Sequence, residues 1–180
     1  LDIIFTAEDE VLNGFAVPAN YTIIWVDQND AALWTGDKKW LRTVLAHELQ
    51  HLVYFNTVKG PWWLPEPMNS LAHGTPAWIV EGIAEYFTEE WRPFRYELSH
   101  RYHVLRNTVH KIQDPHNDGY SKSLYLADRF GDSTISKILN HRNKLKFLDF
   151  KESFKKHTGI PIKQFNEDCR RQMNSFYFSQ

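Results

Sequence analysis

The segment Lys38–Phe55 reads KKWLRTVLAHELQHLVYF and carries two histidines four residues apart, with a glutamate directly after the first. Its apolar residues recur at helical spacing, which predicts an α-helix. Because residues four apart lie on one helix face, His47 and His51 can direct two imidazole nitrogens at one ion. Glu48 lies beside them and can reach a water on that ion. This spacing is typical of the zinc helix of metal-dependent proteases, although HExxH also arises by chance on exposed helices.

The residues around the two histidines favour a metal site over a chance pattern. The flanking stretches 43–46 (TVLA) and 52–55 (LVYF) are apolar, so we expect much of the helix to be buried. Buried polar side chains without partners are costly, and a bound metal would supply partners. A catalytic zinc ion takes three protein ligands and a water, so a third protein ligand is required. The candidates downstream are Glu66, His73, Glu81 and Glu85.

These four candidates fall into two groups. Glu66 and His73 lie in a proline-rich segment, which predicts a less regular backbone. Glu81 and Glu85 lie on the predicted helix 77–87 (AWIVEGIAEYF), where their spacing places them on one face. The alternative for this pair is a solvated acidic stripe, but the apolar residues around Glu81 argue against its full exposure.

The pattern outside these two helices predicts a helix-dominated α+β fold. Residues 1–6 (LDIIFT) and 21–27 (YTIIWVD) are typical of strands, whereas 13–20 (NGFAVPAN) carries Asn-Gly and proline and indicates a loop. Residues 114–119 (DPHNDG) indicate a turn. Further helices are expected at 94–112, 120–130, 133–144, 149–159 and 161–178.

The composition suits one globular domain. The chain has 180 residues, of which 42% are hydrophobic, so it can bury a sizeable core. We expect a single domain over residues 1–180, with a strand-rich N-terminal lobe over about 1–37. A net charge of −1 argues against a nucleic-acid-binding face, and no apolar run approaches the length of a membrane span. The lone cysteine, Cys169, is expected to be a bystander.

Two segments together resemble a known family. HELQH (47–51) and WIVEGIAEYF (78–87) are similar to the gluzincin zinc metallopeptidases, in particular the M1-aminopeptidase-like branch and the peptidase MA-like domains of bacterial exported proteins. The second segment matches the W-x-x-E-G-x-A signature of that branch. The resemblance implies a zincin-like fold, in which a short N-terminal β-sheet precedes an active-site helix, a glutamate helix and a helical C-terminal part. It also implies a Zn²⁺ ion held by His47, His51 and Glu81.

The resemblance assigns further roles near this ion. Glu85, one turn after Glu81, is implied to accept a hydrogen bond from a ligand histidine, expected to be His47. Because glycine has no side chain, Gly82 is also expected to let the HELQH helix and the glutamate helix approach closely. Between His51 and Glu81 lie 29 residues (81 − 51 − 1), more than in the best-known gluzincins. This longer segment includes an apolar group that either forms a wall beside the cleft or packs on the body of the protein: Trp62, Trp63 and Leu64.

A third segment is similar to the Y-x-K-G helix that follows the zinc helices in M1-type enzymes. Residues 119–131 read GYSKSLYLADRFG, and the family's tyrosine corresponds to Tyr120. Its hydroxyl is thereby implied to stabilise the tetrahedral oxyanion. Ser123 replaces the family's glycine, so the match is partial. Reserve donors on the preceding predicted helix are Tyr102, His103 and His110.

The resemblance implies a zinc-dependent peptidase in which Glu48 is the general base for a zinc-activated water. Residues 13–26 lie where gluzincins carry the strand that pairs with an extended peptide. The G-x-M-E-N segment with which M1 aminopeptidases hold the free amine of a substrate is absent from the sequence, which leaves endopeptidase and aminopeptidase activity open.

Two alternatives remain, namely an inactive module that holds zinc or a peptide without turnover, and a zinc hydrolase with another substrate.

Neither an initiator methionine nor the pattern of a signal peptide is visible at the start of the sequence. We expect a piece of a longer precursor from which an export signal has been removed. By resemblance, we expect the protein in the periplasm, at the cell surface or secreted, with a peptide or protein substrate and no nucleic-acid partner.

Overall fold

The structure is a computed structural model and describes residues 1–7, 14–26, 37–65, 68–69, 73–88, 92–112 and 114–179. In this part of the chain, a three-stranded sheet is followed by seven α-helices and one 3₁₀ helix, which confirms the helix-dominated α+β class. The strands are β1 (Asp2–Thr6), β2 (Gly14–Val17) and β3 (Tyr21–Trp25). The helices are α2 (Asp37–Thr57), α4 (Ala77–Phe87), α5 (Arg92–Leu105), η1 (Val109–Lys111), α6 (Pro115–Phe130), α7 (Ser133–Asn140), α8 (Phe150–Thr158) and α9 (Ile162–Phe178).

The sheet has the strand order β1-β3-β2, with β1 parallel and β2 antiparallel to β3. The predicted loop at 13–20 is therefore wrong over Gly14–Val17, where Phe15 pairs with Ile23. The proline that suggested a loop lies after this strand, in the turn that leads to β3. Asn20 completes the turn with a φ of 69°, a conformation that asparagine tolerates better than most residues.

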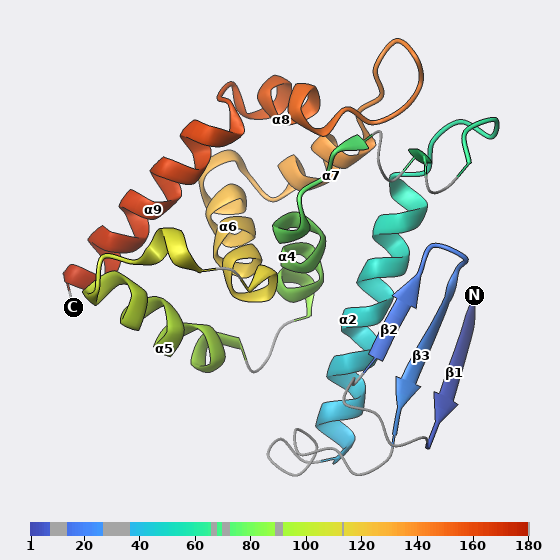
Figure 1. Cartoon of the computed structure of the whole chain (residues 1–180), viewed down its shortest axis with the longest axis horizontal. Coiled ribbons are helices and arrows are strands. Elements are labelled where there is room, and N and C mark those ends of the chain that lie inside the picture. The colour runs from blue at the N-terminus through green and yellow to red at the C-terminus, as the bar shows by residue number, and fades with distance from the viewer. Residues whose placement is uncertain are drawn as a thin grey trace.

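Helix α2 lies between the sheet and the remaining helices (Figure 1). On the sheet side, Ile24 of β3 packs against Trp40 and Val44. On the other side, Tyr54 and Val58 belong to a larger apolar core. Because both sides of α2 are covered, the polar residues in its middle are held between the sheet and the helical body.

The larger core joins α4, α6, α7, α8 and α9. Its centre is aromatic, with Phe165 stacked on Trp78 at 5.8 Å between ring centroids and in edge contact with Phe154. Cys169 lies in the same core, where burial raises its pKa to about 12, so the thiol is poorly suited to chemistry. Within the described residues, no helix combines the length and the apolar character that crossing a membrane requires.

Helix α6 begins at Pro115, five residues before the predicted start, so the turn predicted at 114–119 is wrong. Asp114 occupies the N-cap and accepts a hydrogen bond from the backbone N–H of His116 at 3.0 Å. Proline at the first helical position is favoured because its missing N–H would have no helical partner there. This early start places one more turn of helix, and with it His116, beside α4.

Helices α4 and α6 touch through two glycines. A Cβ atom on Gly82 would overlap the backbone carbonyl of Gly119, and one on Gly119 would lie 2.7 Å from the Cα of Gly82 and overlap the carbonyl oxygen of Trp78. Gly82 thus permits a close helix approach, but its partner is α6 and not the helix of His47 and His51 that the sequence suggested. Because the obstructing atoms belong to the backbone, neither contact can be relieved by a side-chain rotation.

We predict that Gly82→Ala destabilises the protein by about 2 kcal/mol or more, because the two helices must move apart to admit a methyl group. Alanine in a helix is otherwise favoured over glycine by about 1 kcal/mol, so the contact reverses the usual sign. Chemical denaturation of the variant measures the effect. Ser175→Ala, at an exposed position of α9, is the control and should change the free energy of unfolding little. A Gly82→Ala variant as stable as the wild type would contradict this packing.

Candidate metal centre

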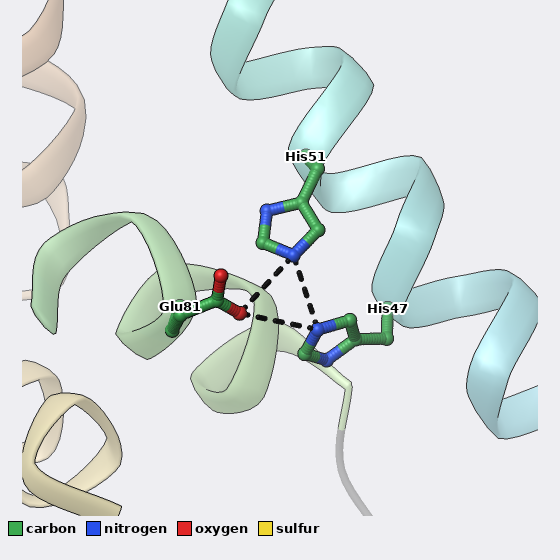
Figure 2. Close-up of side chains that lie close together, drawn as sticks. All are labelled: His47, His51 and Glu81. Atoms are coloured by element: carbon green, nitrogen blue, oxygen red, sulfur yellow. Dashed lines mark hydrogen bonds and ion pairs between the residues drawn. The ribbon is translucent and has the colours of Figure 1, made fainter. Parts of the chain in front are cut away.

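Three side chains from two helices converge on one point (Figure 2). His47 and His51 lie one turn apart on α2, and their Nε2 atoms are 3.1 Å apart. Oε2 of Glu81, on α4, lies 3.5 Å from the Nε2 of His47 and 3.2 Å from that of His51. These three residues form a group that could hold a metal ion.

The spacing of the three donor atoms suits a small ion. Ligands about 2.0–2.1 Å from a tetrahedral zinc ion are about 3.3 Å from one another. The three observed separations, from 3.1 to 3.5 Å, bracket that value. Two imidazole nitrogens and one carboxylate oxygen are also donors that zinc accepts. His47, His51 and Glu81 therefore fit a zinc ion, which is the metal expected from the sequence.

Glu85 lies where the sequence places a support for His47. Its Oε1 is 3.3 Å from the Nδ1 of His47, and its side chain is only 3% exposed. A carboxylate at Nδ1 accepts that N–H and leaves Nε2 to face the centre. For His51, by contrast, Nδ1 is buried and has no hydrogen-bond partner among the described residues.

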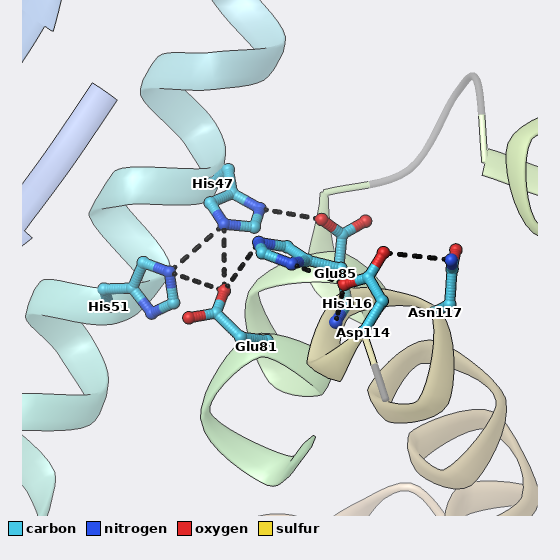
Figure 3. A network of polar contacts seen from close by, with 7 residues as sticks. All are labelled: His47, His51, Glu81, Glu85, Asp114, His116 and Asn117. Carbon is cyan, nitrogen blue, oxygen red and sulfur yellow. Dashed lines mark hydrogen bonds and ion pairs between the residues drawn. The ribbon is translucent and has the colours of Figure 1, made fainter. Parts of the chain in front are cut away.

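His116 is a further member of this group that the sequence analysis did not identify (Figure 3). Its Nε2 lies 3.1 Å from Oε2 of Glu81, and its Nδ1 lies 3.1 Å from Oδ1 of Asp114. Its ring stacks on His47 with 5.8 Å between the centroids. The sequence contained one usable signal, because Asp-Pro at 114–115 is a common start of a helix and would have placed His116 in its first turn.

Glu48 is almost completely buried between α2 and the first residue of β2. A Cβ atom on Gly14 would lie 2.8 Å from Cγ and 3.0 Å from Oε1 of Glu48. Any larger residue at position 14 would therefore push the Glu48 side chain from its place. Burial raises the pKa of Glu48, and this outweighs the lowering by His51 and by a hydrogen bond from the Ala16 backbone. A carboxylate of raised pKa accepts a proton more readily.

The charges of the centre follow from burial and contact. Burial lowers the pKa of His47, so its imidazole is neutral at pH 7 and has a lone pair to offer. Burial alone would raise the pKa of Glu81, but hydrogen bonds from His116, His47 and His51 outweigh it and hold the pKa below its usual range. The hydrogen bond between His116 and Glu81 in turn raises the pKa of His116 to about 9.

Of the other candidates for the third ligand, His73 lies away from the centre. Glu66 lies outside the described residues. His73 is buried elsewhere, where its Nδ1 is 2.7 Å from the hydroxyl of Thr75 and its ring is in edge contact with Tyr54. Trp62, in the segment between His51 and Glu81, is 96% exposed and does not pack on the body of the protein.

Tyr120 is placed one turn beyond His116 on α6. It lines a cavity of about 450 Å³ between α5, α6 and α9, together with His100 and Ser121. Its role as an oxyanion donor stays a prediction.

The three reserve donors lie on or after α5. His103 lies 3.0 Å from the hydroxyl of Thr108, and the remaining two are exposed: Tyr102 and His110.

The pairing of His116 with Glu81 predicts a pH dependence of the metal-free chain. A histidine whose pKa rises to about 9 on folding stabilises the protein fully below its unfolded pKa of about 6.5 and loses this effect as the pH rises through 9. We therefore expect wild type to be more stable than His116→Ala at pH 6 and equally stable above pH 9.5. Urea unfolding of both proteins without metal, at several pH values, measures the difference. A difference that is the same at every pH would contradict the pairing.

Comparison of the chain with models of protein families, with curated proteins and with solved structures gave no match in any of the three. The geometry and chemistry of the residues described above are therefore what identifies the candidate centre.

Proposed function

We propose that the chain is a zinc-dependent peptidase. The observation that carries the proposal is the convergence of His47, His51 and Glu81 with Glu48 buried beside them. A zinc ion held by these three ligands would lower the pKa of a water and polarise the carbonyl of a substrate. Two histidines and one glutamate are a donor set of known catalytic zinc sites, which keep a position for water.

The proposed role of Glu48 is to accept the proton of the attacking water and to pass it to the leaving amine. Its position supports this role, because it follows His47 directly on α2 and interacts electrostatically with both His51 and Glu81. The raised pKa of Glu48 matches the task, since the carboxylate must first take up a proton and then release it.

A peptide is the substrate that the sheet favours. Among the described residues, β2 is an edge strand, and its first residue, Gly14, contacts Glu48. An edge strand offers unpaired backbone groups to an extended peptide, which can then bind independently of its sequence. The side chains of Glu81 and His116 are 24% and 38% exposed, so the centre is open to solvent on that side. Export of the protein, expected by resemblance, remains part of the proposal.

Replacement of a ligand should abolish metal binding, whereas replacement of the base should abolish only turnover. We expect about one zinc per wild-type chain and, for His47→Ala, an affinity more than about 100-fold lower, because even the partners of ligands contribute 10–100-fold. Glu48→Gln should keep zinc and lose at least about 100-fold in peptide hydrolysis. Elemental analysis and a fluorogenic peptide assay measure the two effects. Glu48→Gln with wild-type turnover would refute the mechanism.

The contact of β2 with the base predicts a second separation of binding from turnover. Gly14→Ala should displace the carboxylate of Glu48, because the added methyl group would overlap its Cγ. We expect at least a tenfold loss of kcat, of the order that misplacing a catalytic group by about 1 Å produces, with unchanged zinc affinity. Phe15→Ala, which truncates an exposed side chain in the same strand, serves as the control. Equal kcat values for Gly14→Ala and wild type would exclude this role of Gly14.

A further inference from the structure

His116 approaches the same oxygen of Glu81 as the two histidines of α2. All three Nε2 atoms lie within 3.5 Å of one oxygen, Oε2 of Glu81, and the His116 distance of 3.1 Å is the shortest. That oxygen is the atom that Glu81 directs at the candidate ion (Figures 2 and 3). A histidine that only supported Glu81 from outside would be expected at the other carboxylate oxygen.

The ring of His116 lies just outside the positions that the ligands of one zinc ion take. Two imidazoles that share one zinc through Nε2 have ring centroids about 5 Å apart, given zinc–nitrogen distances of about 2.0–2.1 Å. The centroids are 4.8 Å apart for His47 and His51, and 5.8 Å apart for His47 and His116. The separation of His47 and His116 is wider than this value, so the His116 side chain has to turn toward the ion to coordinate it. In the present arrangement, donor atoms of His116, His47 and Glu85 lie within 4.8 Å of one another, in a group that includes neither His51 nor Glu81.

The surroundings of His116 orient its Nε2 toward the centre. Oδ1 of Asp114 lies 3.1 Å from its Nδ1, which is the carboxylate–histidine arrangement found behind metal ligands. Asp114 is fixed in turn, because Oδ1 accepts the backbone N–H of His116 and Oδ2 accepts the side-chain amide of Asn117 at 2.9 Å. The pairing of His47 with Glu85 follows the same pattern.

We propose that His116 is a displaceable fourth protein ligand of the metal, which competes with water for the remaining position. This proposal rests on the metal centre of the proposed function. The side chain is more exposed than those of His47 and His51, and it projects from the first turn of α6. It can therefore leave the ion without disturbing the core. A centre of this kind is closed when His116 is bound and open to a substrate when it has turned away.

The competing interpretation is that His116 only donates a hydrogen bond to Glu81. The two interpretations differ in what a substitute must provide. Glutamine at this position keeps an N–H that can reach Glu81 but has no imidazole lone pair. His116→Gln should therefore behave as the wild type if the role is hydrogen bonding, and as His116→Ala if the role is ligation.

The test measures metal binding by the whole chain with Zn²⁺ and Co²⁺ alone. We expect zinc affinity, determined by competition with a chromogenic chelator, to fall at least about tenfold in both His116→Ala and His116→Gln. The visible absorption of the Co²⁺ form should also weaken and shift, because a nitrogen ligand is exchanged for water. His110→Ala removes an exposed histidine of η1 that belongs to neither group of possible metal ligands, and it should change neither quantity. Circular dichroism confirms that each variant is folded.

Unchanged zinc affinity and an unchanged Co²⁺ spectrum in His116→Ala would overturn the fourth ligand while leaving the peptidase proposal intact. Wild-type affinity in His116→Gln alone would also overturn it, in favour of hydrogen bonding. Failure of the proposed function has a different signature, because the wild type would then bind no zinc, or would bind zinc without hydrolysing peptides.

Discussion

The contact between Gly82 and Gly119 fixes the geometry on which the rest of the centre depends. Both glycines lie close to residues of the centre in sequence. Gly82 directly follows Glu81, and Gly119 lies about one helical turn after His116. With the two backbones in direct contact, the carboxylate and the imidazole meet at 3.1 Å. A larger side chain at either glycine would push the two helices apart. The carboxylate of Glu81 and the imidazole of His116 would then move apart as well.

Burial then gives similar side chains different properties. Glu48 and Glu81 are both substantially buried, yet the pKa of Glu48 is raised and that of Glu81 is lowered. The difference arises because Nε2 atoms of three histidines lie within 3.5 Å of Oε2 of Glu81, whereas burial against the backbone of β2 dominates for Glu48. One carboxylate is thereby kept ionised, as a ligand requires, and the other can take up a proton.

The sequence predicted the parts of the centre whose spacing is local. His47 and His51 share a helix face, and so do Glu81 and Glu85, so the helical period alone brings each pair together. The strands β1 and β3 were predicted from their branched residues, but β2 was not, because four residues that pair with a neighbour carry too little pattern of their own. His116 was missed because Asp-Pro was interpreted as a turn. Its proximity to Glu81 depends on a contact between distant segments, which no single-sequence pattern encodes.

The centre also joins parts of the chain that are far apart in sequence. Glu81 follows His51 by 30 residues (81 − 51), and His116 follows Glu81 by 35 (116 − 81). An ion bound here would tie α2 to α4 and, because it binds only the folded chain, would stabilise that state by its binding free energy. In such an arrangement the metal would be part of the folding equilibrium, and its supply would influence how much of the chain is folded as well as how much is loaded.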